Sequence, residues 1–124
     1  MEKMTAEPTS YLPGYDFSLE GRLLLEGRSI PENACKFYDP LIDFVNQLEA
    51  EYVLFDINLD YFNTASSKKL LELLKHLDNN AQIKRVQVNW HYEEGDESSV
   101  ETAEIYEECL KRVDFRLHEY AETA

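Results

Sequence analysis

YVLFDINLDYFNTASSKKLLELLKHL, residues 52–77, predicts a β-strand, a short polar turn and an α-helix in direct succession. In the first part, apolar side chains alternate with polar ones, at Val53, Phe55, Ile57, Leu59 and Tyr61. This two-residue period is typical of a sheet with one buried face. In the last part, leucines follow the i, i+3, i+4, i+7 spacing of an amphipathic helix, at Leu70, Leu73, Leu74 and Leu77.

The turn between these elements carries four polar side chains, Asn63, Thr64, Ser66 and Ser67. The simpler explanation is helix capping, for which either Asn63 or Thr64 would suffice, because a side-chain oxygen there accepts an otherwise unpaired N–H group. The alternative is that one hydroxyl is a phosphorylation site, since the positive end of a helix favours an anion. Lys68 and Lys69 lie one turn further and could also pair with a phosphate. Local sequence leaves both explanations open.

Length and composition indicate one domain with a sizeable core. The chain has 124 residues, 44% of them hydrophobic, and that length fits a single domain. We expect a loose arm at residues 1–13, interrupted by Pro8 and Pro13, one domain at 14–121 and a tail at 122–124. No apolar run is long enough to cross a bilayer, and the N-terminus has no signal-peptide pattern, so we expect a cytoplasmic protein without membrane insertion.

The formal net charge of −13 argues against a broad basic surface for nucleic acid or an anionic membrane. A protein partner with basic patches fits this charge better. Cys35 and Cys109 form no metal or redox motif, and each lies in a predicted helix beside apolar positions. We therefore expect reduced, buried thiols.

The remaining elements complete an α/β fold. Residues 15–19 and 22–26 predict a hairpin, and residues 85–92 and 115–119 predict two further strands. Capping boxes at Ser29–Glu32 and Ser98–Glu101 predict two more helix starts. The order ββαβαβαβ indicates a five-stranded mixed sheet with parallel neighbours joined by right-handed crossovers. Because apolar and polar side chains alternate cleanly in the strands at residues 52–61 and 85–92, we expect the helices to cover mainly one face of the sheet. The opposite face would be solvated or reserved for a partner, and carries Asp56, Asn58, Asp60, Gln87, Asn89 and His91.

Signals for a conventional active site are weak. Asp56 and Asp60 would lie about 13 Å apart along a strand, too far to share an ion directly. Asp60 could instead accept a phosphoryl group, although no neighbouring acids for magnesium are evident. The acidic segment 93–108 lacks the ligand pattern of a calcium loop and fits a solvated helix face or an acidic docking surface. His76, His91 and His118 come from separate elements without ligand spacing. We predict no catalytic residue, cofactor or metal; a small metal-dependent or phosphate-accepting signalling protein that uses Asp56, Asp60 and the acidic segment remains the alternative.

Three segments matter in combination: GRSIPENACKFYDPLIDFV at 27–45, YFNTASSKKLLELL at 61–74 and VNWHYEEGDES at 88–98. Together they resemble the SiaC family of bacterial regulatory phosphoproteins, over nearly the whole chain from about Tyr15 to Tyr120. The resemblance implies a non-enzymatic partner switch. In that family, a threonine directly after the asparagine is phosphorylated by a cognate Ser/Thr kinase and dephosphorylated by a PP2C-type phosphatase. The unphosphorylated form binds and activates a diguanylate cyclase, which raises cyclic di-GMP and favours aggregation or biofilm growth.

Carried onto this sequence, the resemblance implies that Thr64 is the phosphorylation site. The chain departs from the family at Ala65, where a serine is common. The expected partner-binding residues are Asn63, Thr64, Ser66, Ser67 and Lys68, with Arg28, Ser29 and Glu32 as a neighbouring contact. By analogy with anti-sigma-factor antagonists, whose phosphorylated serine also opens a helix beside a strand, a STAS-like architecture is expected.

Overall fold

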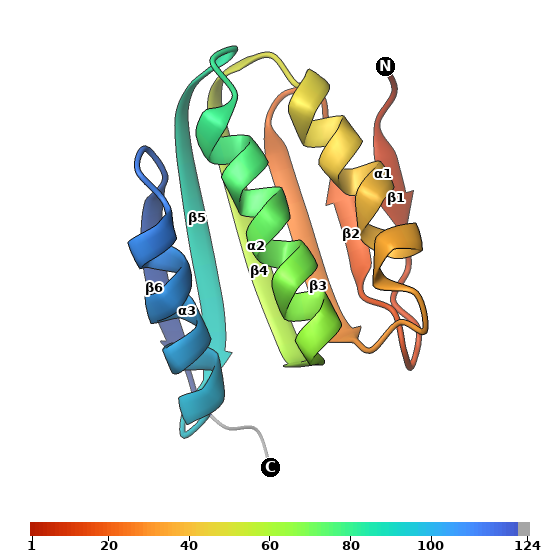
Figure 1. The fold of residues 1–124 in the computed structure, drawn as a ribbon, viewed down its shortest axis with the longest axis vertical. Coiled ribbons are helices and arrows are strands. Elements are labelled where there is room, and N and C mark those ends of the chain that lie inside the picture. Colours follow the sequence, from red (N-terminus) through yellow and green to blue (C-terminus); the bar gives the residue numbers. More distant parts are fainter. Residues whose placement is uncertain (122–124) are drawn as a thin grey trace.

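Three helices cover one face of a six-stranded sheet in the computed structural model, which describes residues 1–121 (Figure 1). The expected tail 122–124 lies outside the described residues. The strands are β1 (Met4–Ala6), β2 (Gly14–Phe17), β3 (Arg22–Ser29), β4 (Ala50–Phe62), β5 (Ile83–Glu93) and β6 (Asp114–Tyr120). The helices are α1 (Ala34–Gln47), α2 (Thr64–Asn79) and α3 (Glu97–Cys109).

The strands follow one another across the sheet in sequence order, from β1 to β6. The pairs β1–β2 and β2–β3 are antiparallel, whereas β3–β4, β4–β5 and β5–β6 are parallel and are joined through the helices. The predicted α/β class, mixed sheet and single covered face are confirmed. The strand count differs, because residues 4–6 of the expected arm pair with β2 and add a sixth strand.

The core lies between the helices and the sheet. Alternate residues of β4 and β5 are buried beneath the helices, and the leucine stripe of α2 is fully buried against them. Aromatic rings interlock there: Phe17 packs on Phe55, and Trp90 packs on Tyr106. The indole N–H of Trp90 donates to Ser99 Oγ over 2.8 Å, so the one polar atom of that ring is satisfied inside the core.

A β-bulge at the end of β4 changes which side chain points into the core. Leu59 pairs with Gly27 and Tyr61 pairs with the next residue, Arg28, so β4 carries one residue more than β3 at this point. The prediction that Tyr61 continues the buried face is therefore wrong, and its side chain is 52% exposed. Phe62 takes the inward position instead and packs edge-on against Trp90.

Two predicted helix starts are also wrong. Asn33, not Ser29, caps α1 by accepting the Lys36 N–H, and Asp96, not Ser98, caps α3 by accepting the Ser99 N–H. The reason at α1 is tertiary: β3 extends through Ser29, which pairs with Phe62 of β4, so the helix begins only afterwards. The expected burial of the two thiols is wrong as well, since Cys35 and Cys109 are free and exposed in the terminal turns of α1 and α3.

Candidate functional site

The candidate site lies where β4 ends and α2 begins. Asn63 is the N-cap of α2, and its side-chain oxygen accepts the backbone N–H of Ser66 over 2.9 Å. One of the free N–H groups of the helix start is therefore already satisfied by Asn63. Thr64 is the first residue of the helix and is exposed. Among the described residues, its hydroxyl has no hydrogen-bond partner, so capping does not explain it.

Ser66 lies inside the molecule, two residues from the exposed Thr64. Its side chain and that of Ser29 are both 0% exposed. Ser29 Oγ donates to Ser66 Oγ over 2.8 Å, and Ser66 Oγ donates to the carbonyl of Ser29 over 3.0 Å. Since each hydroxyl has one proton, the 2.6 Å contact between Tyr38 and Ser29 must be donated by Tyr38. These hydroxyls join α1, β3 and α2 beneath the start of α2, and neither serine is available to a partner in this conformation.

Ser67 is half-buried and is held by α3. The Tyr106 hydroxyl donates to the Ser67 carbonyl over 2.5 Å, and it lies 3.0 Å from Ser67 Oγ. Because the single tyrosine proton is directed to the carbonyl, Ser67 Oγ donates to the tyrosine oxygen. Burial raises the pKa of Tyr106 to about 12, so its phenol stays protonated even in alkaline solution. The side chain of Ser67 is therefore engaged within the protein.

Cationic side chains lie beside the start of α2. Lys68 is exposed, one helical turn after Thr64 on the same side of the helix. Lys69 is already paired, with Asp39 at 2.6 Å and Glu72 at 3.1 Å, and hydrogen bonds to these carboxylates raise the pKa of its ammonium group. Lys68, not Lys69, is thus placed to meet an anion at Thr64.

The expected second contact is only partly at the surface. Arg28 is exposed at the end of β3, and its guanidinium lies 5.8 Å from the centre of the Tyr61 ring, a cation–π geometry. Glu32 is exposed in the loop before α1. Ser29, between them, is buried as described above. The sequence-predicted site thus separates into exposed residues (Arg28, Glu32, Thr64 and Lys68), half-buried Asn63 and Ser67, and buried Ser29 and Ser66.

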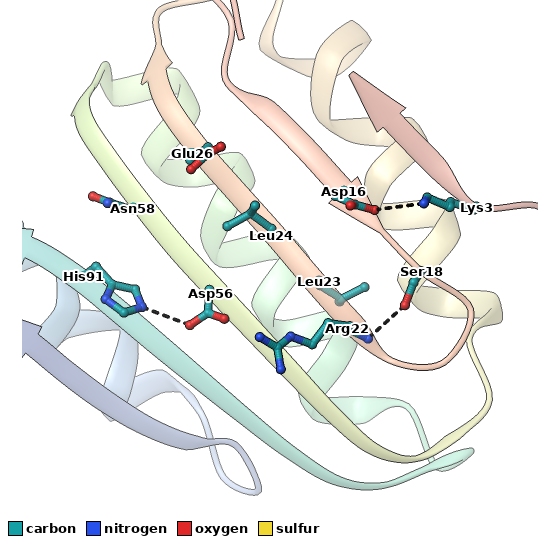
Figure 2. A pocket seen from close by; sticks show the side chains of 10 residues that line it. All are labelled: Lys3, Asp16, Ser18, Arg22, Leu23, Leu24, Glu26, Asp56, Asn58 and His91. Atoms are coloured by element: carbon teal, nitrogen blue, oxygen red, sulfur yellow. Dashed lines mark hydrogen bonds and ion pairs between the residues drawn. The ribbon is translucent and has the colours of Figure 1, made fainter. Parts of the chain in front are cut away.

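A second polar region lies on the helix-free face of the sheet. A shallow cavity of about 560 Å³ there is lined by residues of β2 to β5, by Ser18 in the turn between β2 and β3, and by Lys3. Figure 2 shows His91 and Arg22 on either side of the Asp56 carboxylate. His91 Nε2 lies 2.9 Å from Asp56 Oδ1, and Asn89 Nδ2 donates to the same oxygen over 3.1 Å. Burial by itself raises the pKa of Asp56, but these hydrogen bonds and the nearby positive charge outweigh it and hold the pKa below its usual value.

This region gives no support to metal or phosphoryl chemistry. The Asp56 carboxylate is already hydrogen-bonded to His91 and Asn89, and Asp60 is exposed at the β-bulge. Within residues 1–121, no group of three or more His, Cys, Asp or Glu side chains is arranged to hold a metal ion. The acidic residues of α3 lie largely on its exposed side. Over the same described range, no helix has the length and apolar character to cross a membrane.

Tyr38 and Tyr106 are the site residues that sequence reasoning missed. Tyr106 belongs to the apolar stripe of α3, and Tyr38 lies fully buried next to the apolar stripe of α1. Their hydroxyls reach partners 9 and 39 residues away in sequence. A buried tyrosine requires such a partner, but the chain offers no local signal for which residue supplies it.

Comparisons with known proteins agree on one family. A family model described as "SiaC family regulatory phosphoprotein" matches residues 6–120. An uncharacterized protein of Pseudomonas aeruginosa (strain UCBPP-PA14) is 35% identical over an alignment of 92 residues that covers 71% of this chain and 73% of that protein.

Two solved structures of Pseudomonas aeruginosa SiaC are similar over almost the whole chain. The structure of the diguanylate cyclase SiaD in complex with its activator SiaC matches with a TM-score of 0.83 and 27% identity, covering 94% of this chain and 99% of that one. Apo-SiaC matches with a TM-score of 0.76 and 28% identity, covering 95% and 99%. The six-stranded sheet and its three helices are thus those of a known fold.

Proposed function

The chain belongs to the SiaC family of regulatory phosphoproteins, and from this premise we propose that it is a non-catalytic partner switch that binds and activates a diguanylate cyclase. Phosphorylation of Thr64 controls that binding in this proposal. Support for the cyclase as partner comes from the likeness to SiaC, which was crystallised with the cyclase SiaD as its activator.

The observation that carries the proposal is the exposed Thr64 hydroxyl at the first position of α2. Asn63 already caps the helix, Ser66 is buried and Ser67 is bonded to Tyr106. Thr64 therefore has a hydroxyl that the fold does not use and that another protein can reach. A free hydroxyl at a helix N-terminus is also where a phosphate is best tolerated.

A phosphate on Thr64 would act through the surface that the partner meets. It adds about −1.5 to −2 charges at neutral pH together with a bulky group. In this proposal the surface comprises the exposed residues Thr64, Lys68, Arg28 and Glu32, with the half-buried Asn63 and Ser67 at its edge. If the cyclase covers Thr64, the phosphate must be desolvated or meets like charge, and binding weakens. In the unphosphorylated form, the cation of Lys68 is free to contact an acidic group of the cyclase.

The proposal includes the proteins that would set the state of Thr64. A cognate Ser/Thr kinase adds the phosphate and a PP2C-type phosphatase removes it, in the cytoplasm. The output is cyclic di-GMP, with aggregation or biofilm growth as the cellular result. These assignments rest on family membership.

The test is a reconstituted cyclase assay. Unphosphorylated wild-type protein is added to purified diguanylate cyclases of the source bacterium, and cyclic di-GMP formed from GTP is measured together with complex formation. Thr64→Ala should bind and activate like wild type, whereas Thr64→Glu should bind about tenfold or more weakly, as expected for a rim charge that becomes unfavourable. Ser98→Glu is the matched control, because it adds the same charge at an exposed position in the first turn of another helix.

Two results would contradict the proposal. One is that no diguanylate cyclase of that bacterium binds or responds to the wild-type protein. The other is that Thr64→Glu and Ser98→Glu affect activation equally, which would mean that charge at Thr64 has no specific role.

A further inference from the structure

Three hydroxyls lie within four residues at the start of α2, and the structure treats each differently. Thr64 is exposed, Ser66 is 0% exposed, and Ser67 is half-buried against α3. A kinase that approaches this turn meets three candidate acceptors within one turn of the helix. Something must determine which of them is modified.

We propose that Tyr106 is a specificity-determining residue that withholds Ser67 from the kinase and so confines phosphorylation to Thr64. This inference rests on the proposed function, because it presupposes a kinase acting on this turn. It goes beyond that function by assigning the choice of acceptor to a residue of α3, 42 positions after Thr64 in the chain.

The chemistry of phosphoryl transfer explains why a hydrogen bond matters here. The hydroxyl oxygen of the acceptor forms a bond to the γ-phosphorus of a nucleoside triphosphate, the bond from that phosphorus to the β,γ-bridging oxygen breaks, and the nucleoside diphosphate leaves. The hydroxyl proton passes to a base of the kinase. The acceptor must therefore be exposed, with its proton free to reach that base in an in-line arrangement.

Ser67 is only partly exposed, and its proton is not free while Tyr106 is in place. Its proton is directed to the Tyr106 oxygen 3.0 Å away, and its carbonyl is held by the Tyr106 proton over 2.5 Å. This pair of bonds fixes both the side chain and the backbone of Ser67. The ring of Tyr106 is held in turn by Trp90, with centroids 5.6 Å apart, so the phenol cannot turn away without disturbing the core.

Ser66 is protected independently of Tyr106. Its hydroxyl is bonded to Ser29 on the opposite side of the helix start, and no described contact of that network includes α3. Thr64, in contrast, is held by neither network. Removal of the Tyr106 hydroxyl should therefore release Ser67 alone.

The experiment is phosphosite mapping of Tyr106→Phe by peptide mass spectrometry. This variant keeps the ring against Trp90 and deletes only the hydroxyl. The protein is isolated from the source bacterium lacking the PP2C-type phosphatase; in a second arm, purified protein is incubated with the catalytic domain of a broad-specificity Ser/Thr kinase and MgATP. We expect phosphate at Ser67 to rise about tenfold or more over wild type, since two hydrogen bonds that hold it are lost, while Ser66 stays unmodified. Tyr92→Phe is the control, because its hydroxyl bonds only to the exposed Glu119.

The pattern of sites distinguishes the outcomes. New phosphate at both Ser66 and Ser67 would mean that the helix start had loosened as a whole, and it would overturn the specific role of Tyr106. Unchanged Ser67 in both arms would overturn it too. An unmodified Thr64 in wild-type protein from cells would contradict the proposed function instead, and the broad-specificity kinase would still decide whether Tyr106 protects Ser67.

Discussion

Asn63 and Thr64 are adjacent polar residues with different tasks. Asn63 accepts a helix N–H group, whereas the Thr64 hydroxyl has no partner among the described residues. Asn63→Ala should therefore lower the free energy of unfolding by about 1 kcal/mol, the usual cost of a lost cap. Thr64→Ala should stay within about 0.5 kcal/mol of wild type, as an ordinary surface substitution does. Urea denaturation followed by Trp90 fluorescence measures both, and equal losses would show that Thr64 also serves as a cap.

Asp56 makes the stability of the sheet face depend on pH. Its pKa is lower in the folded protein, so the folded state binds fewer protons at this carboxyl than the unfolded state. The stabilisation is therefore fully present above the unfolded pKa of about 3.9 and is lost as the pH falls through the lower folded value. Asp56→Asn should cost about 1.5–3 kcal/mol at pH 5.5, the usual range for hydrogen bonds to a charged group, and less near pH 2.5, where the carboxyl of the unfolded chain is protonated.

Denaturant titrations of wild type and Asp56→Asn at several pH values measure this difference. Glu26→Gln is the control, since Glu26 lines the same cavity but is exposed, and its side chain forms no hydrogen bond or ion pair with the described residues. A wild-type advantage that stays constant from pH 5.5 to 2.5 would contradict the assigned role of the ionised carboxyl.

Single residues were predicted well where strand alternation alone decides which face of the sheet they occupy. The strand alternation placed Asp56, Asn89 and His91 together on one face, and the structure brings these three into contact. Ser29 and Ser66 were expected at the surface but are buried, because they bond to each other across 37 residues of chain. That contact depends on where the end of β3 lies relative to the start of α2. The sequence pattern of either segment alone does not predict this relative position.

At the scale of elements, the end of α2 is tied to the start of β6. Asp78, nearly buried in the last turn of α2, accepts the backbone N–H groups of Lys111, Arg112 and Val113 at 2.7–3.1 Å. This carboxylate satisfies three successive N–H groups in the connection from α3 to β6. It therefore fixes the edge strand relative to the helix layer.

Asp78→Ala should lower the free energy of unfolding by about 3 kcal/mol, because three backbone N–H groups lose a charged acceptor. The loss of stability should be greatest around the broken hydrogen bonds, so amide hydrogen exchange should increase most at residues 111–113. Asn79→Ala, at the exposed neighbouring position, is the control. If exchange increased equally throughout the sheet, Asp78 would not be the specific support of this connection.

The helices and long strands were predicted because their periodicities are strong, whereas their boundaries were not. The strand β1 has only three residues, too few for a period to be recognised, and exists because β2 pairs with it. The bulge at Asp60 reversed the expected orientation of Tyr61, since one extra residue exchanges the two faces of a strand. Caps were misplaced where a serine with a glutamate three residues later lay near the true helix start.

At the scale of the whole molecule, alternation of helices and strands was sufficient to predict a mixed sheet covered on one face. The parallel connections follow from that alternation, and the clean polar alternation of β4 and β5 predicted helices mainly on one face. The proposed partner and the proposed switch could not be derived in this way. Both proposals are inferred from family membership and from one exposed hydroxyl, because a binding partner leaves no periodic pattern in the sequence of a single chain.

A phosphate at Thr64 should alter a surface without altering the fold. An anion at the start of a helix interacts favourably with its dipole, so Thr64→Glu should leave the free energy of unfolding unchanged or raise it by about 0.3–1 kcal/mol. In ¹H–¹⁵N NMR spectra, shifts should concentrate at the first turn of α2 and decline toward β1 and β2, which contact neither Thr64 nor Lys68. Chemically or enzymatically phosphorylated protein should give the same pattern. Two results would mean that the modification acts by unfolding: chemical-shift changes of similar size across the sheet, or a decrease of several kcal/mol in the free energy of unfolding. A loss of cyclase binding would then be explained by unfolding and not by a changed surface.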